Sequence, residues 1–148
     1  MKAIIAALIA FGGLFSLGDS RADTVWVDIQ AKDSIGQRLG YLVRDGIRRS
    51  AGMSLADREV DAVITLDLVS VDLSDVRPGV RSAYSAVWAV RAKLPDPCGW
   101  TVAMPSGNTV GVCPAVAVDE CAQDLVAKAD RLISDMKARG DGKRLIQR

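Results

Sequence analysis

Two stretches of the chain, Asp61–Leu73 and Val80–Ala92, alternate apolar and polar residues, and a loop that contains Pro78 and Gly79 separates them. A period of two residues is typical of strands with one buried face. Proline followed by glycine is common in turns. We therefore predict that a long β-hairpin forms the centre of the fold.

The alternation changes phase inside the first of these strands. The apolar positions are Ile64, Leu66 and Leu68, and after them Val69 and Val71. A change of phase requires either a bulge or a change in which face of the strand is covered. We expect a bulge or a strong bend near Leu68 and Val69.

The segments before the hairpin predict a strand, a helix and a loop. Thr24–Gln30 alternates as a half-buried strand does. Apolar residues then recur at helical spacing, and Ser34 with Gln37 has the pattern of a capping box at the start of a helix. Gly52 is a suitable C-terminal cap. The polar segment Met53–Val60 is expected to be a connecting loop.

The segments after the hairpin predict two more strands and a helix. Trp100–Met104 and Thr109–Cys113 flank the turn-like sequence Pro105–Asn108, which indicates a second, shorter hairpin. Asp119–Arg139 carries a continuous apolar stripe at helical spacing. The element order is strand, helix, four strands, helix. We predict an α+β fold in which an antiparallel sheet of four to five strands carries two helices on one face.

Residues 1–22 resemble a secretory signal peptide. Lys2 supplies a positive charge before an apolar run, and Ser20 and Ala22 are small residues at the positions that a signal peptidase recognises. We expect cleavage between Ala22 and Asp23, and an uncleaved anchor is the alternative. Cleavage would leave no stable membrane anchor, because no later apolar run has spanning length.

The remaining chain is expected to form a single α+β domain over residues 23–140, followed by a flexible tail at 141–148. A high-GC bacterial source is indicated by 16 Asp against two Glu and 13 Arg against six Lys. Together with the leader, this composition places the protein in the periplasm of a Gram-negative bacterium, or outside the cell.

The charge balance argues against nucleic-acid binding. Residues 1–22 hold two of the 19 basic residues and one of the 18 acidic residues, so the remaining chain carries 17 of each. Proteins that bind nucleic acid need a basic surface to neutralise phosphates. The net charge of zero gives no such surface.

Three cysteines follow the leader, and an oxidising compartment allows disulfides. An odd number indicates one disulfide and one free thiol. We favour Cys98–Cys113, across the open end of the short predicted hairpin. The alternative is Cys113–Cys121, which would join the end of a strand to the first turn of the last helix.

The chain contains no histidine. Ser-His-Asp and Cys-His catalysis and histidine-ligated zinc sites are therefore excluded. Acids close in sequence occur at Asp57 and Glu59 and at Asp119 and Glu120, where structural roles are the better explanation. The sequence predicts no catalytic residue, no metal site and no cofactor.

Trp26 and Tyr41 are the aromatic residues best placed to contact a partner. Trp26 lies opposite the apolar face of its strand, where it either packs or is exposed. Tyr41 falls near the edge of the apolar face of the first helix.

The sequence DAVITLDLVSVDL, followed by GVRSAYSAVWAV and a final amphipathic helix, resembles small periplasmic domains. These are the amino-terminal domain of TolB and the CsgG and LpoB proteins. The resemblance lies in the order of elements, and it implies an α+β domain that docks protein partners. An uncharacterised secreted family is the alternative.

We therefore expect a non-enzymatic periplasmic domain that binds another cell-envelope protein. The first alternative is a small-ligand-binding or inhibitor-like domain. The second is an enzyme that uses Asp residues on cell-wall glycans.

Overall fold

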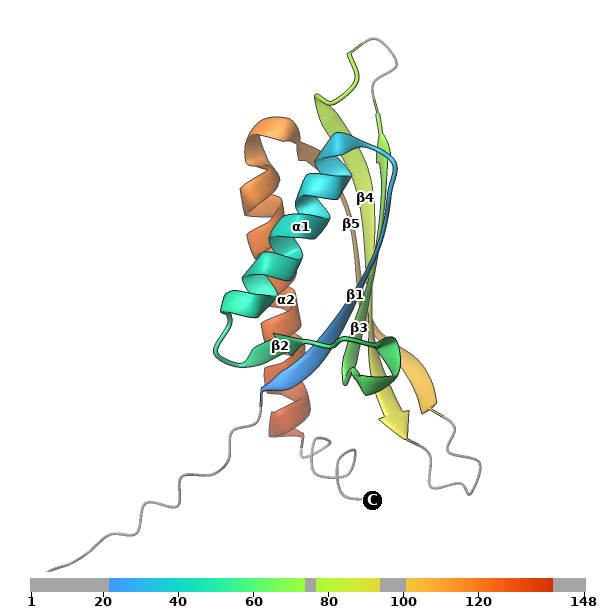
Figure 1. Cartoon of the computed structure of the whole chain (residues 1–148), viewed down its shortest axis with the longest axis vertical. Helices are drawn as coiled ribbons and strands as arrows, with labels where there is room; N and C mark the ends of the chain where they lie inside the picture. The colour runs from blue at the N-terminus through green and yellow to red at the C-terminus, as the bar shows by residue number, and fades with distance from the viewer. Residues whose placement is uncertain (1–21, 74–76, 94–100, 140–148) are drawn as a thin grey trace, which may run out of the picture.

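The computed structural model describes residues 22–73, 77–93 and 101–139, and Figure 1 shows a sheet with both α-helices on one side. The elements are β1 (Asp23–Ala31), α1 (Ser34–Arg49), β2 (Met53–Leu55), η1 (Glu59–Asp61), β3 (Ile64–Asp72), β4 (Arg81–Lys93), β5 (Thr101–Pro114), η2 (Ala115–Ala117) and α2 (Val118–Ala138). The predicted signal peptide, except for Ala22, and the predicted tail lie outside the described residues, as does Cys98.

The sheet order is β2-β1-β3-β4-β5. Strand β1 runs parallel to β2 and β3, whereas β3, β4 and β5 are antiparallel neighbours. The α+β class, the five strands and the two helices on one face are confirmed, but the sheet is mixed instead of antiparallel. The reason is that α1 is a crossover connection, which returns the chain to the direction of β1.

Two segments differ from their predicted structure. Met53–Leu55, predicted as loop, is the short strand β2, which is stabilised by pairing with β1. The second hairpin is wrong, because Thr101–Pro114 is one continuous strand along β4. Its pairing passes from Trp88–Gly107 to Ala89–Pro105, so Ser106 forms a bulge. An edge strand tolerates Pro105 at such a bulge.

The core lies between the sheet and the two helices. Alternate residues of the central strands face the helices, and one face of each helix packs on them. The residues buried there include Val25, Val27, Leu39, Val43, Ile47, Leu66, Leu68, Ala86, Trp88, Leu125, Ala129 and Ile133.

The change of phase in β3 is not a bulge, so that prediction is wrong. The pairing of β3 with β4 is regular through Leu68 and Val69. Instead, the buried Ser70 faces the helices at the next inward position, while Val69 and Val71 face the other side of the sheet and are exposed. From this point the inner face carries a polar residue and the outer face carries apolar ones, while the pairing of β3 with β4 continues without a bulge.

Ser70 is buried because Asp33 accepts its hydrogen bond. Asp33, and not Ser34 as predicted, is the N-cap of α1, and its Oδ1 accepts the Gly36 amide hydrogen bond at 2.7 Å. Ser70 Oγ donates to Asp33 Oδ2 at 2.6 Å, and Ser82 Oγ donates to Oδ1 at 2.5 Å. The cap therefore joins α1 to both strands of the long hairpin.

Gly36 allows this close contact. A Cβ at this position would lie 1.6 Å from Ser70 Oγ, so any side chain would push α1 away from β3. In the hairpin loop next to this contact, Gly79 adopts a φ of 79°, which favours glycine, and its amide donates to Asp72 Oδ2 at 2.6 Å.

The disulfide joins Cys113 to Cys121, with the two Cα atoms 6.2 Å apart. The favoured pairing of Cys113 with Cys98 is therefore wrong, and the alternative pairing is correct. Since Cys113 lies near the end of β5 and Cys121 lies in the first turn of α2, the bond fixes the start of this helix to the sheet. A disulfide is consistent with an oxidising compartment.

Candidate functional site

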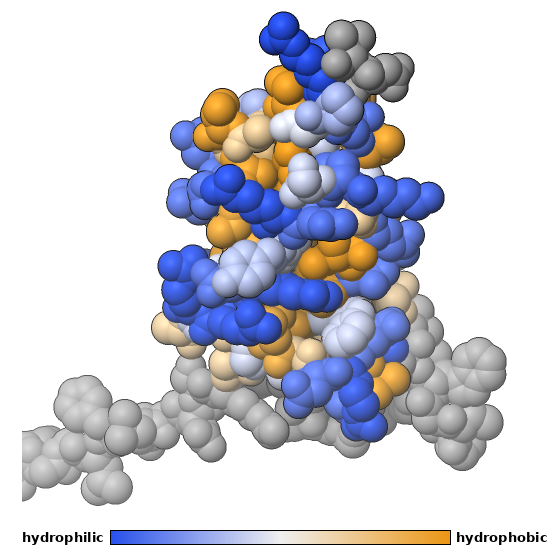
Figure 2. Space-filling view, turned by 45° about the horizontal axis from the view of Figure 1, so that its top comes forward, coloured by the Kyte–Doolittle hydropathy of each residue, from blue (hydrophilic) through white to orange (hydrophobic). Residues whose placement is uncertain are grey.

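The face of the sheet away from the helices carries an exposed apolar patch. Its members are Val69 and Val71 of β3 and Val110 and Val112 of β5, and we call it the valine face. Their exposed fractions range from 46% for Val69 to 75% for Val110. On the face shown in Figure 2, by contrast, hydrophobic residues lie in small groups between polar ones.

The four valines are neighbours across three strands. Val71 pairs with Ala83, which pairs with Val112. In the adjacent row, Ser85 stands between Val69 and Val110. The small residues Ala83 and Ser85 of β4 therefore lie between the valines of β3 and those of β5.

The valine face occupies only part of the outer side of the sheet. Further along the strands Thr65 and Ala89 also face outward, yet both are buried. In the same region Arg91 of β4 forms an ion pair with Glu59 of η1. The segment between β2 and β3 thus covers one end of the outer side, whereas no described segment covers the end near the Gly79 turn.

Charges of opposite sign flank the valine face. At one end Asp28 and Asp67 are direct neighbours on β1 and β3. Partial burial raises the pKa of the Asp67 carboxyl, and the negative charges of Asp28 and Glu59 raise it further. At the other end, Arg81 is exposed on the same side of β4 as Ala83.

Trp26 lies on the outer side of β1 and is half-buried. It lines a hollow of about 490 Å³ together with Arg44, Arg48 and Asp57, among other residues. Arg44 donates to the carbonyl oxygen of Val27 at 2.8 Å, and so satisfies part of the edge of β1 that extends beyond β2.

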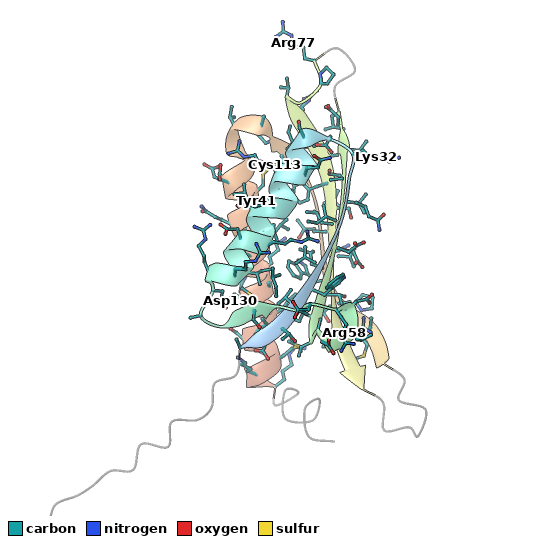
Figure 3. The ribbon with its side chains drawn as sticks, in the orientation of Figure 1. Lys32, Tyr41, Arg58, Arg77, Cys113 and Asp130 are labelled. Carbon is teal, nitrogen blue, oxygen red and sulfur yellow. A yellow bond between two sulfur atoms is a disulfide. The ribbon has the colours of Figure 1, made fainter. Side chains whose placement is uncertain are left out.

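Tyr41 is exposed on α1, as Figure 3 shows. It does not line the hollow beside Trp26, so the structure does not bring the two predicted contact residues into one cavity. Their proposed role in contacting a partner stays a prediction.

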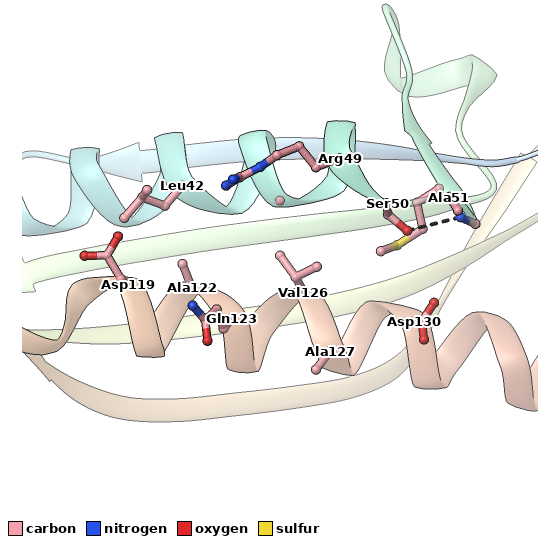
Figure 4. Close-up of a pocket in the computed structure, with 13 residues that line it drawn as sticks. Leu42, Arg49, Ser50, Ala51, Asp119, Ala122, Gln123, Val126, Ala127 and Asp130 are labelled. Atoms are coloured by element: carbon pink, nitrogen blue, oxygen red, sulfur yellow. Dashed lines mark hydrogen bonds between the residues drawn. The ribbon is translucent and has the colours of Figure 1, made fainter.

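A groove of about 510 Å³ lies between α1 and α2. Figure 4 shows Ala122 and Val126 of α2 pointing toward α1, with Arg49, Asp119 and Asp130 around them. The helices are in close contact at the groove, because a Cβ on Gly46 would lie 2.7 Å from Val126 Cγ2.

The buried group around Asp33 is structural. Burial would raise the pKa of its carboxyl, but the hydrogen bonds from Ser70, Ser82 and the Gly36 amide outweigh burial and lower it. Both serine hydroxyls donate to this carboxylate, and its lowered pKa makes it a weak base toward them.

Two of the four candidate catalytic acids form ion pairs. Glu59 pairs with Arg91, and Asp119 pairs with Arg38 at 2.9 Å. Within the described residues no group of three or more acids and cysteines has the geometry of a metal site. Neither described helix is long and apolar enough to cross a membrane.

The sequence contained the pattern of the valine face, but the pattern alone did not show that the four valines form one surface. The change of phase placed Val69 and Val71 on the side opposite Leu68, which we interpreted as a bulge. Val110 and Val112 also alternate with small residues, but they were assigned to a short hairpin. The signal was present in both strands, and the continuous pairing with β4 was needed to combine them.

The chain matches no protein-family model and no curated protein sequence. Among solved structures, PelC of Paraburkholderia phytofirmans, a dodecamer, has TM-scores of 0.40 and 0.35 in two crystal forms, with 12% and 19% identity. These matches cover 70% and 73% of this chain and 85% and 86% of PelC.

A proposed lipoprotein from Caulobacter crescentus CB15 has a TM-score of 0.37 and 15% identity, over 78% of this chain and 92% of that one. These structures are not the TolB, CsgG or LpoB domains that we expected the chain to resemble. At these scores the likeness assigns the chain neither a family nor a function.

Proposed function

We propose that this protein is a non-enzymatic domain of the bacterial cell envelope that binds another envelope protein on its valine face. The observation that carries the proposal is the group of four exposed valines on the side of the sheet opposite both described α-helices. Exposed apolar patches that are bordered by polar residues commonly mark protein-binding sites.

Burial of the valine face would supply part of the free energy of a specific contact. Complete burial of a valine contributes at least about 1.5 kcal/mol, so burying four that are already half-covered would contribute about 3 kcal/mol. Charged groups at the two ends would fix the orientation. We expect a partner with an apolar strip, a basic group facing Asp28 and Asp67, and an acidic group facing Arg81.

The envelope location is supported by two independent features. The first is the predicted leader at residues 1–22, and the second is the disulfide between Cys113 and Cys121. The absence of histidine supports the non-enzymatic part of the proposal, because it removes the commonest general base.

Site-specific photocrosslinking tests the proposal. A photoreactive residue is placed at Val71 or at Val60 in the protein expressed in its source organism. Val60 is a matched control, because both side chains are 59% exposed but Val60 lies in η1, outside the valine face. We expect a reproducible adduct with one envelope protein from position 71 only, and we expect Val71→Lys to abolish co-purification of that protein.

Two results would contradict the proposal. One is equal crosslinking from positions 60 and 71, which would mean that the contacts are non-specific. The other is co-purification of the same partner with the Val71→Lys variant, which would place the contact elsewhere on the surface.

The groove between α1 and α2 favours a second candidate function, which is binding of a small molecule. Its volume of about 510 Å³ lies in the range of ligand sites, and its lining is partly apolar. Native mass spectrometry of the purified protein should then show a retained mass that Val126→Trp, which fills the groove, removes. A protein that carries no additional mass when purified from its source would exclude a tightly bound ligand.

A further inference from the structure

Strand β5 forms one edge of the sheet, and no described residue pairs with its outer side. It has 14 residues, and none of them is charged. Edge strands of natural proteins usually carry charged residues, especially lysine, which prevent pairing with other chains. On β5 the bulge at Ser106 and the neighbouring Pro105 protect only the first half of the edge.

The ladder with β4 determines which backbone groups of the second half are free. Ala115 donates its amide hydrogen to the carbonyl oxygen of Val80 at 2.9 Å, and these residues lie opposite each other. In an antiparallel pair, hydrogen-bonded positions alternate with non-bonded positions. Thr109, Gly111 and Cys113 therefore bond to β4, whereas Val110 and Val112 direct their N–H and C=O groups toward the open edge.

We propose that β5 pairs in antiparallel orientation with β5 of a second copy of this chain, about a two-fold axis at Gly111. In this register Val110 lies opposite Val112 of the second copy, and the two residues exchange both of their free hydrogen bonds. The same holds for Val112, because a two-fold axis makes the contact isologous. Gly111 meets its own copy at the axis, where it has no side chain to clash.

The charges on the adjacent helix are complementary in this arrangement. Helix α2 descends along β5, from Cys121, which is bonded to Cys113, to Lys128, which donates to Thr109 Oγ1. Glu120 lies two turns before Lys128 on this side of the helix. The two-fold axis brings Lys128 of each copy toward Glu120 of the other.

Asp124 lies between them, near the axis. It is close enough to Tyr84 to raise the pKa of that phenol further, after the larger effect of partial burial. The two Asp124 carboxylates of a dimer thus lie between two lysines, which offset their repulsion.

Pairing at this edge also extends the valine face. Val110 and Val112 of one copy would adjoin Val112 and Val110 of the other, so the two apolar patches become one surface across the two sheets. The pairing does not depend on the proposed function, because it uses the backbone of β5 instead of the side chains of β3.

Sedimentation velocity over a concentration series tests the dimer, with the protein secreted to and purified from the periplasm of an expression host. We expect the wild type to sediment as a dimer and Val112→Pro as a monomer. Since the Val112 amide faces the open edge, proline removes no bond to β4. The variant's thermal midpoint shows whether it still folds. Val71→Lys, which alters the valine face away from the edge, should stay dimeric.

A cysteine-mixing experiment tests the register in a Cys98→Ser background. Hydrogen-bonded residues have Cα atoms about 5.5 Å apart, which suits a disulfide. Under mild oxidation, a mixture of Val110→Cys and Val112→Cys proteins should therefore form covalent dimers, whereas either variant alone should not. The mixture separates this register from one centred on Val110, where the Val110→Cys protein would crosslink with itself.

Three results would overturn the inference. A wild type that is monomeric at every concentration would exclude the dimer. A dimer that persists in folded Val112→Pro would place the contact at another surface. Crosslinking of Val110→Cys alone, or no crosslinking of the mixture, would exclude the proposed axis at Gly111.

Discussion

The inner and outer faces of the sheet share the same strands but differ in what covers them. On β3 the inward residues Leu66 and Leu68 are fully buried by the helices, whereas the outward residues Val69 and Val71 are exposed. The buried polar residue Ser70 occupies a position on the apolar inner face. Exposed valines occupy positions on the outer face where polar residues are expected. This exchange places the folding core on the inner face and supports our proposal that the outer face contacts another molecule.

Truncation of one residue on each face should show the largest difference in stability between the two faces. We expect Leu66→Ala to lower the free energy of unfolding by about 3 kcal/mol, because it leaves a cavity in the core. Val71→Ala should change it by less than about 0.5 kcal/mol, as is usual for exposed positions. Urea unfolding of the two variants measures the difference. Equal losses would show that Val71 also belongs to the folding core.

The close packing of α1 on the inner face of the sheet can be tested by substitution of Gly36. We expect Gly36→Ala to lower the free energy of unfolding by about 2 kcal/mol, because the new Cβ overlaps Ser70 Oγ and forces the helix outward. Gly107→Ala is the matched control, since a Cβ there meets no atom within 4 Å. Thermal unfolding of both variants would contradict this account if the control lost as much stability as Gly36→Ala.

The buried polar group on the inner face should make stability depend on acidity. The pKa of Asp33 is below its ordinary value of 3.8 in the folded protein. A lowered pKa stabilises the folded state above the unfolded value, and this contribution is lost as the pH falls through the folded pKa. The free energy of unfolding should therefore fall below about pH 5.

Replacement of the cap separates this effect from general acid unfolding. We expect Asp33→Ala to lower stability at neutral pH by about 1–2 kcal/mol, the usual loss of an N-cap. Its unfolding free energy should then fall less steeply between pH 5 and pH 3 than that of the wild type. Over this pH range a single group can change the unfolding free energy by about 3 kcal/mol at most. Parallel pH profiles for the two proteins would show that Asp33 does not carry the dependence.

The elements with strong periodicity were predictable from the sequence. The long hairpin, the first strand and both helices follow from apolar residues at periods of two or 3.6. The short strand β2 could not be recognised, because three residues carry little periodic signal and pairing with β1 stabilises them. Strand β5 contains Pro105 and Gly107, whose local preference for a turn is overridden by pairing with β4.

The candidate site was predictable only in part. The phase change in β3 located Val69 and Val71, but its cause is Asp33, which lies 37 residues before Ser70 in the sequence. The favoured disulfide was wrong because it was built on a hairpin that does not form. Contacts between residues far apart in the sequence decided both outcomes.

The most direct test of the central claim combines two measurements on one protein, the double variant Val69→Lys and Val71→Lys. We predict that its free energy of unfolding stays within about 0.5 kcal/mol of the wild type, because both side chains are exposed. Capture of the envelope partner should be lost, since two ammonium groups would have to be buried in the contact. A variant that unfolds easily, or one that still captures the partner, would contradict the assignment of this face to binding.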